Sequence, residues 1–167
     1  ANAVPIIKLN NATGFAVAGI PLNKCVLPEV IITLGSIPLI EYGTPGTEEL
    51  YRPVTKLLKD YDAFLLANHG ALTVGKDVIN AYHKMETLEH FAHVAFVAQQ
   101  LGYVNTLSKE QVQKLKDQRE KFGIRTTVGC VTSENDSCST EHTPQSNLMN
   151  DDSIKKITDE VLRQIRK

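Results

Sequence analysis

The stretch LLANHGALTVGK (residues 65–76) places a single histidine directly after a short apolar run. His69 lies between an amide and a glycine, at the point where a buried strand is expected to end. One interpretation is an imidazole that hydrogen-bonds to nearby backbone. The other is a metal ligand, because histidine is the commonest metal-binding side chain. A metal site needs further ligands, so the rest of the chain decides which chemistry His69 can do.

A second group of ionisable side chains lies further along the chain at helical spacing. Its members are His83, Glu86, His90 and His93. Their separations of three, four and three residues put them on one face of a helix. Such a face could hold a metal ion. The alternative is a polar stripe that faces water or another subunit.

Two short strands are expected on either side of His69. Residues 62–68 (DAFLLAN) form a continuous apolar run of strand length, which suits a strand covered on both faces. Residues 71–74 (ALTV) continue the pattern after the histidine and its glycine. His69 is therefore expected where the first run ends and the second begins.

Three helices are predicted from spacing and capping residues. Residues 12–18 are apolar and are followed by Gly19, a natural C-terminal stop. Residues 77–102 carry the strongest helical periodicity in the chain. Residues 107–123 begin with Ser108 followed three residues later by Gln111, a capping-box pattern. Their sparse apolar stripe indicates a helix on the surface.

The segment between the first helix and the histidine is harder to interpret. Residues 30–42 are rich in β-branched side chains with a glycine, a serine and a proline between them, which predicts two short strands. Residues 44–61 begin with turn chemistry, and Thr47 or Thr44 could cap a helix there. Pro53 disfavours a helix interior, so this helix is expected to begin late or to hold Pro53 in its first turn.

The composition changes after residue 125, so residues 1–125 are predicted to be one domain. Residues 126–150 are polar and rich in turn formers, which predicts a flexible linker. Residues 151–167 have the pattern of an amphipathic helix. Its narrow apolar face consists of Ile154, Ile157, Val161, Leu162 and Ile165. This segment could be a core helix, a frayed surface helix or a docking element.

Composition excludes several classes of function. The chain has 167 residues, a net charge of −1 and 42% hydrophobic residues, so neither a nucleic-acid partner nor a membrane surface is indicated. The apolar runs are too short to cross a bilayer, and no secretory signal begins the chain. The three cysteines are odd in number and widely spaced, which predicts reduced thiols in an intracellular, cytoplasmic protein.

Four blocks in residues 12–125 resemble the class II aldolase/adducin family. They read TGFAVAGIPLNKCVLPEVIITLGSIPL, EYGTPGTEEL, LLANHGALTVGKDVINAYHKMETLEHFAHVA and LSKEQVQKLKDQREKFGIR. The pattern is similar to that of L-fuculose-phosphate and L-rhamnulose-phosphate aldolases. The resemblance implies an α/β fold, a three-layer α/β/α domain with a mainly antiparallel central sheet. It covers the C-terminal two thirds of that domain, so the domain is expected to be incomplete at its N-terminus.

The family's chemistry is the reversible aldol cleavage of a sugar phosphate to dihydroxyacetone phosphate and an aldehyde. The resemblance implies a zinc ion, Zn(2+), held by three histidines, which polarises the ketone as a Lewis acid. It also implies a homotetramer with active sites between subunits, and a tyrosine that protonates the aldehyde oxygen.

Only part of this machinery carries over to the chain. His69 matches the third zinc ligand. Tyr42 matches the tyrosine, which the resemblance implies acts from a neighbouring subunit, although Tyr42 could also be an amphipathic residue at a strand end. The other two ligand positions are Ile6 and Lys8, which cannot ligate zinc. None of the histidines at 83–93 matches a family ligand, which favours the solvated or subunit-facing stripe.

The resemblance therefore predicts a sugar-phosphate aldolase-like lyase whose activity in this chain is impaired. The alternatives are a non-catalytic adducin-like or remnant domain that acts in assembly and, within the family, a pentulose-phosphate 4-epimerase. The segment 151–167 resembles the encapsulation peptides of bacterial microcompartments. This resemblance predicts that the segment docks on shell proteins and that the protein lies inside such a compartment.

Overall fold

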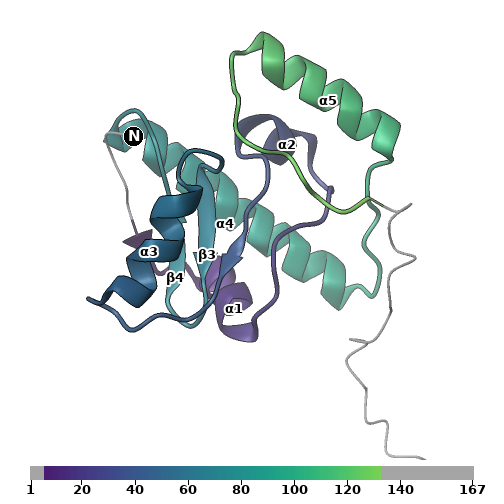
Figure 1. Ribbon diagram of the computed structural model, residues 1–167. Coiled ribbons are helices and arrows are strands. Elements are labelled where there is room, and N and C mark those ends of the chain that lie inside the picture. Colours follow the sequence, from purple (N-terminus) through teal and green to yellow (C-terminus); the bar gives the residue numbers. More distant parts are fainter. Residues whose placement is uncertain (1–5, 133–167) are drawn as a thin grey trace, which may run out of the picture. The chain divides into compact units, whose positions relative to one another are not determined.

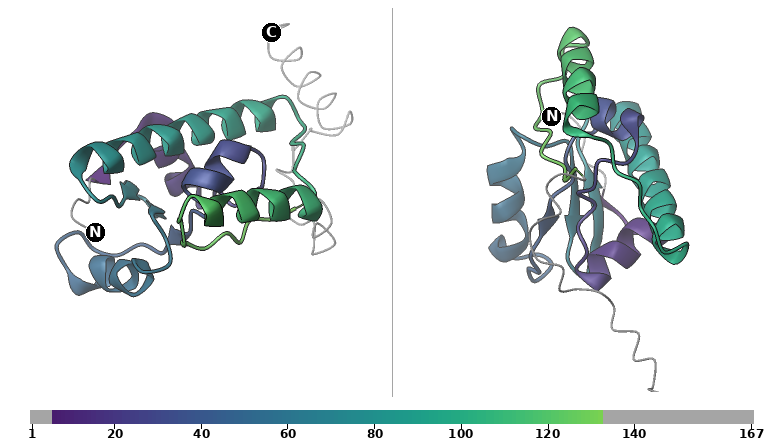
Figure 2. Two further views of the ribbon diagram at one scale, coloured as in Figure 1. Left: turned by 90° about the horizontal axis from the view of Figure 1, so that it is seen from above. Right: turned by 90° about the vertical axis from the view of Figure 1, so that its right-hand side faces the viewer.

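The computed structural model describes residues 6–132, and Figures 1 and 2 show their arrangement. The elements along the chain are β1 (Ile6–Ile7), α1 (Asn10–Ala18), α2 (Pro28–Thr33), β2 (Leu39–Ile40), α3 (Glu48–Leu57), β3 (Ala63–Leu66), β4 (Gly70–Thr73), α4 (Val78–Gln100) and α5 (Lys109–Lys121). No helix among residues 6–132 is both long and apolar enough to cross a membrane.

The strands form one mixed sheet in the order β1-β4-β3-β2. β4 pairs antiparallel with both β1 and β3, whereas β2 pairs parallel with β3. The expected antiparallel sheet is therefore only partly confirmed. The parallel pair arises because the chain crosses from β2 to β3 through a helix, and such a crossover returns the next strand in the same direction.

Helices cover both faces of this sheet, which confirms an α/β fold with helical layers on either side (Figure 2, right). Along β3, Ala63 and Leu65 pack toward α1 and α4, while Phe64 and Leu66 pack toward α3. This alternation follows from the two-residue period of a strand. All four residues of β3 are buried, as expected for the apolar run 62–68.

The structure contradicts the prediction of two strands in residues 30–42. Pro28 to Thr33 form α2, and only Leu39 and Ile40 form a strand. Pro28 occupies the first turn of the helix, where its fixed φ and missing N–H are well tolerated. Val30 and Ile31 are buried in the core, so tertiary packing overrides their β propensity.

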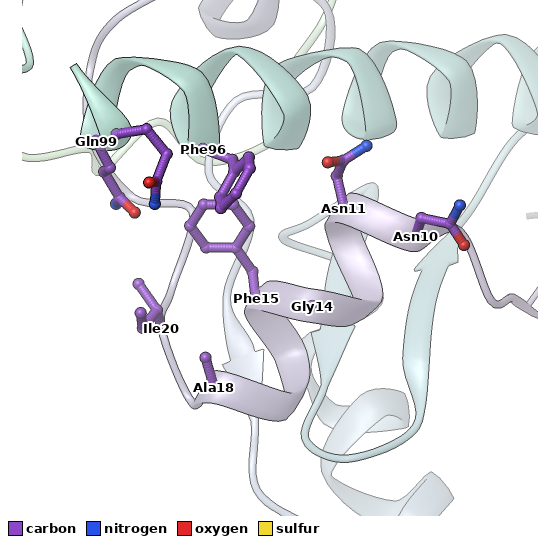
Figure 3. A pocket seen from close by; sticks show the side chains of 9 residues that line it. Asn10, Asn11, Gly14, Phe15, Ala18, Ile20, Phe96 and Gln99 are labelled. Atoms are coloured by element: carbon purple, nitrogen blue, oxygen red, sulfur yellow. The ribbon is translucent and has the colours of Figure 1, made fainter.

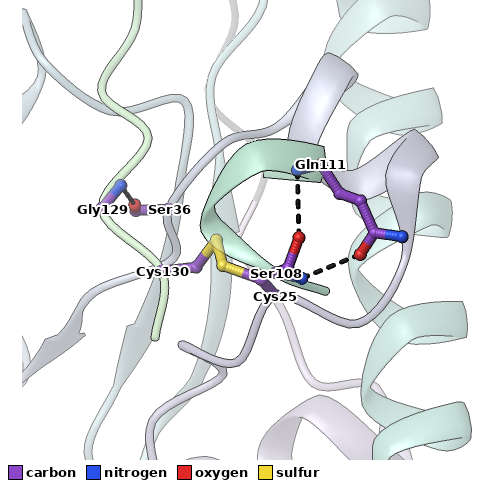
Figure 4. Close-up of a disulfide and its surroundings, with 6 residues drawn as sticks. All are labelled: Cys25, Ser36, Ser108, Gln111, Gly129 and Cys130. Atoms are coloured by element: carbon purple, nitrogen blue, oxygen red, sulfur yellow. Dashed lines mark hydrogen bonds between the residues drawn. A yellow bond between two sulfur atoms is a disulfide. The ribbon is translucent and has the colours of Figure 1, made fainter. Parts of the chain in front are cut away.

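The long helices and their caps follow the sequence pattern closely. α4 begins after Asp77, whose carboxylate accepts the N–H of Asn80 at 2.7 Å. α5 has the predicted capping box between Ser108 and Gln111 (Figure 4). α3 begins directly after Thr47 and contains Pro53 in its interior, so neither alternative offered for Pro53 is correct.

Two of the three cysteines form a disulfide, so the prediction of reduced thiols is wrong for this pair. Cys25 and Cys130 lie 105 residues apart in the chain, and their Cα atoms are 5.3 Å apart (Figure 4). A parallel bridge between Lys24 and Val131 brings the two segments together. Sequence spacing could not show this approach, because it depends on the tertiary fold.

The first residues of the predicted linker, 126–132, lie against the domain. Residues 133–150 and the helix predicted at 151–167 lie outside the described residues. The flexible linker beyond residue 132 and the docking face of the tail therefore stay predictions, whereas Thr127 and Val131 already hydrogen-bond to the domain.

Candidate functional site

His69 lies in the short connection between β3 and β4. Leu66 pairs with Gly70, and the N–H of His69 donates to the carbonyl of Leu66 at 3.0 Å. Asn68 is the only non-glycine residue with positive φ (57°) among residues 6–132. Asparagine tolerates this left-handed conformation better than most residues. The half-buried imidazole of His69 is thus placed by a tight turn rather than by a mobile loop.

Three other segments reach the same edge of the sheet, by which we mean the strand ends beside the β3–β4 turn. β1 ends there, because Ile7 pairs with Ala71 near the start of β4. β2 also ends there, because the N–H of Ala67 donates to the carbonyl of Ile40 at 2.9 Å. Near the C-terminal end of α1, the carbonyl of Ala16 accepts the N–H of Asn68 in the β3–β4 turn at 3.3 Å. Lys8, His69 and Tyr42 are therefore brought to one edge by the backbone.

Tyr42 follows β2 by two residues, and its side chain is 61% exposed. The turn that comes next has Gly46 at its third position with φ of 84°, as a type II turn requires. Gly43 lies so close to α3 that an added Cβ would be 2.5 Å from the backbone nitrogen of Leu50. The chain beside Tyr42 is thus fixed although the phenol itself faces outward.

The residues present do not fit a zinc ion held by three histidines. Of the three positions that the resemblance assigns, only His69 carries a ligating side chain. Residues 6–132 contain no group of three or more histidine, cysteine, aspartate or glutamate side chains able to hold a metal. Within the same range, no hydrogen bond or ion pair joins the side chains of His69 and Tyr42.

The predicted histidine stripe lies on α4. All four side chains of the predicted stripe are exposed. The Nδ1 atom of His83 lies 3.1 Å from a carboxylate oxygen of Glu86. The hydrogen bond from His83 lowers the pKa of Glu86, and a hydrogen bond to Glu86 raises the pKa of Tyr82. None of these contacts builds a metal site among residues 6–132, and whether the stripe faces water or another subunit stays a prediction.

A hollow of about 420 Å³ lies between α1 and α4 (Figure 3). Phe15 and Phe96 form its apolar side, and the amides of Asn11 and Gln99 lie at its rim. Its described lining carries no ionisable side chain, so this hollow offers no acid or base chemistry.

Glu89 is a structural residue that the sequence did not reveal. Its carboxylate accepts the backbone N–H groups of Asn11 and Ala12, each at 2.9 Å. α1 begins after Leu9, which has no side-chain acceptor for these N–H groups. The apolar residue at the N-cap was the available signal, since an uncapped helix start requires an acceptor from elsewhere.

Replacing Glu89 with alanine is expected to lower the free energy of unfolding by about 1–2 kcal/mol, because α1 loses its cap. Hydrogen exchange of the Asn11 and Ala12 amides should accelerate. Glu86→Ala, on the same helix but exposed, is the matched control and should change stability by less than about 0.5 kcal/mol. Equal losses for the two variants, measured by urea unfolding, would contradict the capping role.

Comparison of the sequence with models of known families shows the class to which this chain belongs. Residues 2–96, more than half of the 167 residues, match the model of the class II aldolase and adducin N-terminal domain. The chain therefore belongs to the class II aldolase and adducin family.

Curated relatives match over shorter stretches. A 3-oxo-tetronate 4-phosphate decarboxylase from Pectobacterium atrosepticum is 40% identical over 74 residues, which cover 44% of this chain and 34% of the relative. An L-fuculose phosphate aldolase from Methanococcus maripaludis is 36% identical over 74 residues, which cover 44% of this chain and 40% of the relative. The match thus spans well under half the length of these relatives.

Solved structures confirm the fold. An L-fuculose 1-phosphate aldolase superimposes with a TM-score of 0.62 and 29% identity, covering 72% of this chain and 55% of the other. The protein YgbL from Klebsiella pneumoniae superimposes with a TM-score of 0.61 and 26% identity, covering 67% and 56%. The described domain therefore has the class II aldolase fold.

Proposed function

We propose that this chain carries one edge of a class II aldolase-type site for a phosphorylated sugar or sugar acid. Carbon–carbon cleavage is impaired in the chain as it stands, because Ile6 and Lys8 occupy two ligand positions. The observation that supports this proposal is the convergence of His69 and Tyr42 on one edge of the sheet.

The two kinds of curated relative favour this class of substrate. Their names describe an aldolase and a decarboxylase, both acting on a phosphorylated compound. Each reaction breaks a carbon–carbon bond and leaves an electron pair beside a carbonyl group. A site for either reaction needs hydrogen-bond donors at the oxygen that gains charge.

Two side chains of this chain could supply such hydrogen-bond donors. Tyr42 would donate its phenolic proton to the aldehyde oxygen in the condensation direction and take the proton back during cleavage. The imidazole of His69, set by the β3–β4 turn, would orient the carbonyl group of the substrate. The solvent-exposed phenol leaves room for a substrate, and in the family such a tyrosine serves a site between subunits.

The purified chain should be assayed for zinc content and for two products. These are dihydroxyacetone phosphate from L-fuculose 1-phosphate and carbon dioxide from 3-oxo-tetronate 4-phosphate. We expect slow turnover of one substrate that falls at least about tenfold in Tyr42→Phe, in line with the loss of a positioned acid. Tyr51→Phe, another exposed tyrosine, is the matched control. Absence of both products would favour the non-catalytic assembly role instead.

A further inference from the structure

We propose that the Cys25–Cys130 disulfide is a thiol-exchange site that anchors residues 130–132 to the domain and releases them when a dithiol reduces it. Figure 4 shows the bond between the segment before α2 and the segment after α5. The inference is independent of the proposed lyase function, because it uses none of the residues near His69.

The two sulfur atoms lie in unequal surroundings. Cys25 is fully buried and packs in a cluster with Ile31 and Val112. Its carbonyl also accepts the N–H of Leu107 at 2.7 Å. Cys130 is only half-buried and lies in an irregular segment. An external thiolate therefore reaches Cys130 more easily than Cys25, because access decides which sulfur is attacked.

The exchange balances with a dithiol as the reductant. One thiolate of the dithiol attacks Sγ of Cys130, the Sγ–Sγ bond breaks, and Cys25 leaves as a thiolate that takes up a proton. The second thiolate of the dithiol then displaces Cys130, which is also protonated. The protein gains two electrons and two protons, and the dithiol becomes a cyclic disulfide. The buried Cys25 thiol stays where it is, because a neutral thiol packs as a small apolar group.

The segment before Cys130 has its own attachments to the domain. The N–H of Thr127 donates to the carbonyl of Asp60 at 2.8 Å, and the carbonyl of Thr127 accepts the N–H of Ser36 at 3.0 Å. The N–H of Gly129 donates to the Oγ atom of Ser36 at 2.5 Å. These contacts do not involve the disulfide, so residues up to Gly129 are expected to keep their place after reduction.

Beyond Gly129 the non-covalent attachment consists of two backbone hydrogen bonds, the packing of Cys130 against the cluster of Cys25, Ile31 and Val112, and the burial of Thr132. The N–H of Cys25 donates to the carbonyl of Val131 at 3.0 Å, and the N–H of Val131 donates to the carbonyl of Asn23 at 2.7 Å. The hydroxyl of Thr132 is buried without a partner among residues 6–132. The net gain from two backbone hydrogen bonds and one small buried side chain with an unpaired hydroxyl does not exceed the entropy cost of ordering three residues. The disulfide therefore decides whether this end of the segment stays attached.

Hydrogen exchange on the full-length chain, followed by NMR with and without dithiothreitol, tests the proposal. The amides of Cys25 and Val131 should exchange at least tenfold faster after reduction and recover after reoxidation with oxidised glutathione. The amide of Thr127 should change less than twofold. Cys138→Ser is the background for every measurement, because it removes the remaining thiol and prevents other pairings. In that background, Cys25→Ala with Cys130→Ala should exchange fast at both amides whether or not dithiothreitol is present.

Three results would overturn the proposal. The first is the absence of the Cys25–Cys130 bond in the Cys138→Ser chain after oxidation, seen by alkylation and mass spectrometry. The second is unchanged exchange at Val131 although both cysteines have become alkylatable. The third is faster exchange throughout α4 on reduction, which would mean that the bond supports the whole domain rather than one segment.

Discussion

The double variant Ile6→His with Lys8→His is expected to bind zinc at about one ion per chain, with an affinity at least about 100-fold above that of the unaltered chain. Loss of even an outer hydrogen-bond partner of a ligand costs 10–100-fold in metal affinity, so gaining two ligands should exceed that range. β1 pairs with β4 at Ile7 and Ala71, which places position 8 beside the turn that carries His69. Isothermal titration with zinc measures the gain.

Two control variants make this result specific. Adding His69→Ala to the double variant should remove most of the gained affinity, because one of the three ligands is lost. Placing the new histidines singly on two separate helices, as Lys56→His in α3 with Lys121→His in α5, should leave zinc affinity unchanged, because the two exposed side chains cannot share one ion. If the double variant binds zinc equally well without His69, the three positions do not form one site, and the residue-by-residue match to the family is incorrect.

Replacing Arg119 with methionine is expected to lower the free energy of unfolding by about 2–4 kcal/mol. Arg119 is only 2% exposed, although it comes from a helix predicted to lie on the surface. Its guanidinium donates to the carbonyls of Ile31 and Ile32 at 2.9 and 2.5 Å, and it also donates to the hydroxyl of Thr126. The charged side chain thus occupies the C-terminal end of α2, where the helix dipole favours a cation.

The energetic cost of Arg119→Met arises mainly from the backbone carbonyls that lose their hydrogen-bond donor. Burial lowers the pKa of Arg119, and the charge of Asp62 acts in the opposite direction. Methionine removes the penalty of burying a charge, but it leaves the carbonyls of Ile31 and Ile32 without their donor. Unsatisfied buried acceptors cost more than the net value of the bonds they made, so the loss outweighs the gain.

Urea unfolding followed by circular dichroism at 222 nm measures the change. Arg119→Lys should lose roughly half as much as Arg119→Met, because an ammonium keeps the charge but not the planar fork of donors. Arg125→Met, which alters an exposed arginine a few residues away, should change stability by less than about 0.5 kcal/mol. A similarly small change in Arg119→Met would show that water replaces the guanidinium at the end of α2.

The sequence predicted those helices and strands whose stabilising contacts come from neighbouring residues in the chain. Asp77 and Ser108 accept backbone N–H groups within their own first helical turn, so their caps can be recognised from neighbouring residues. The apolar run at 62–68 also predicted a strand covered on both faces. In contrast, α2 was mistaken for a strand because its β-branched side chains are buried by packing, which propensity does not include.

The sequence by itself predicted the fold class and the side-chain caps of α4 and α5. It also singled out His69 and Tyr42 by their match to the family, and their roles stay predictions. Only the tertiary structure decided which distant residues meet. The Glu89 cap of α1, the burial of Arg119 and the disulfide each join segments 77 to 105 residues apart. The physical reason is that a cap or an alternating strand is fixed by neighbours in the chain, whereas a long-range contact depends on how the layers pack.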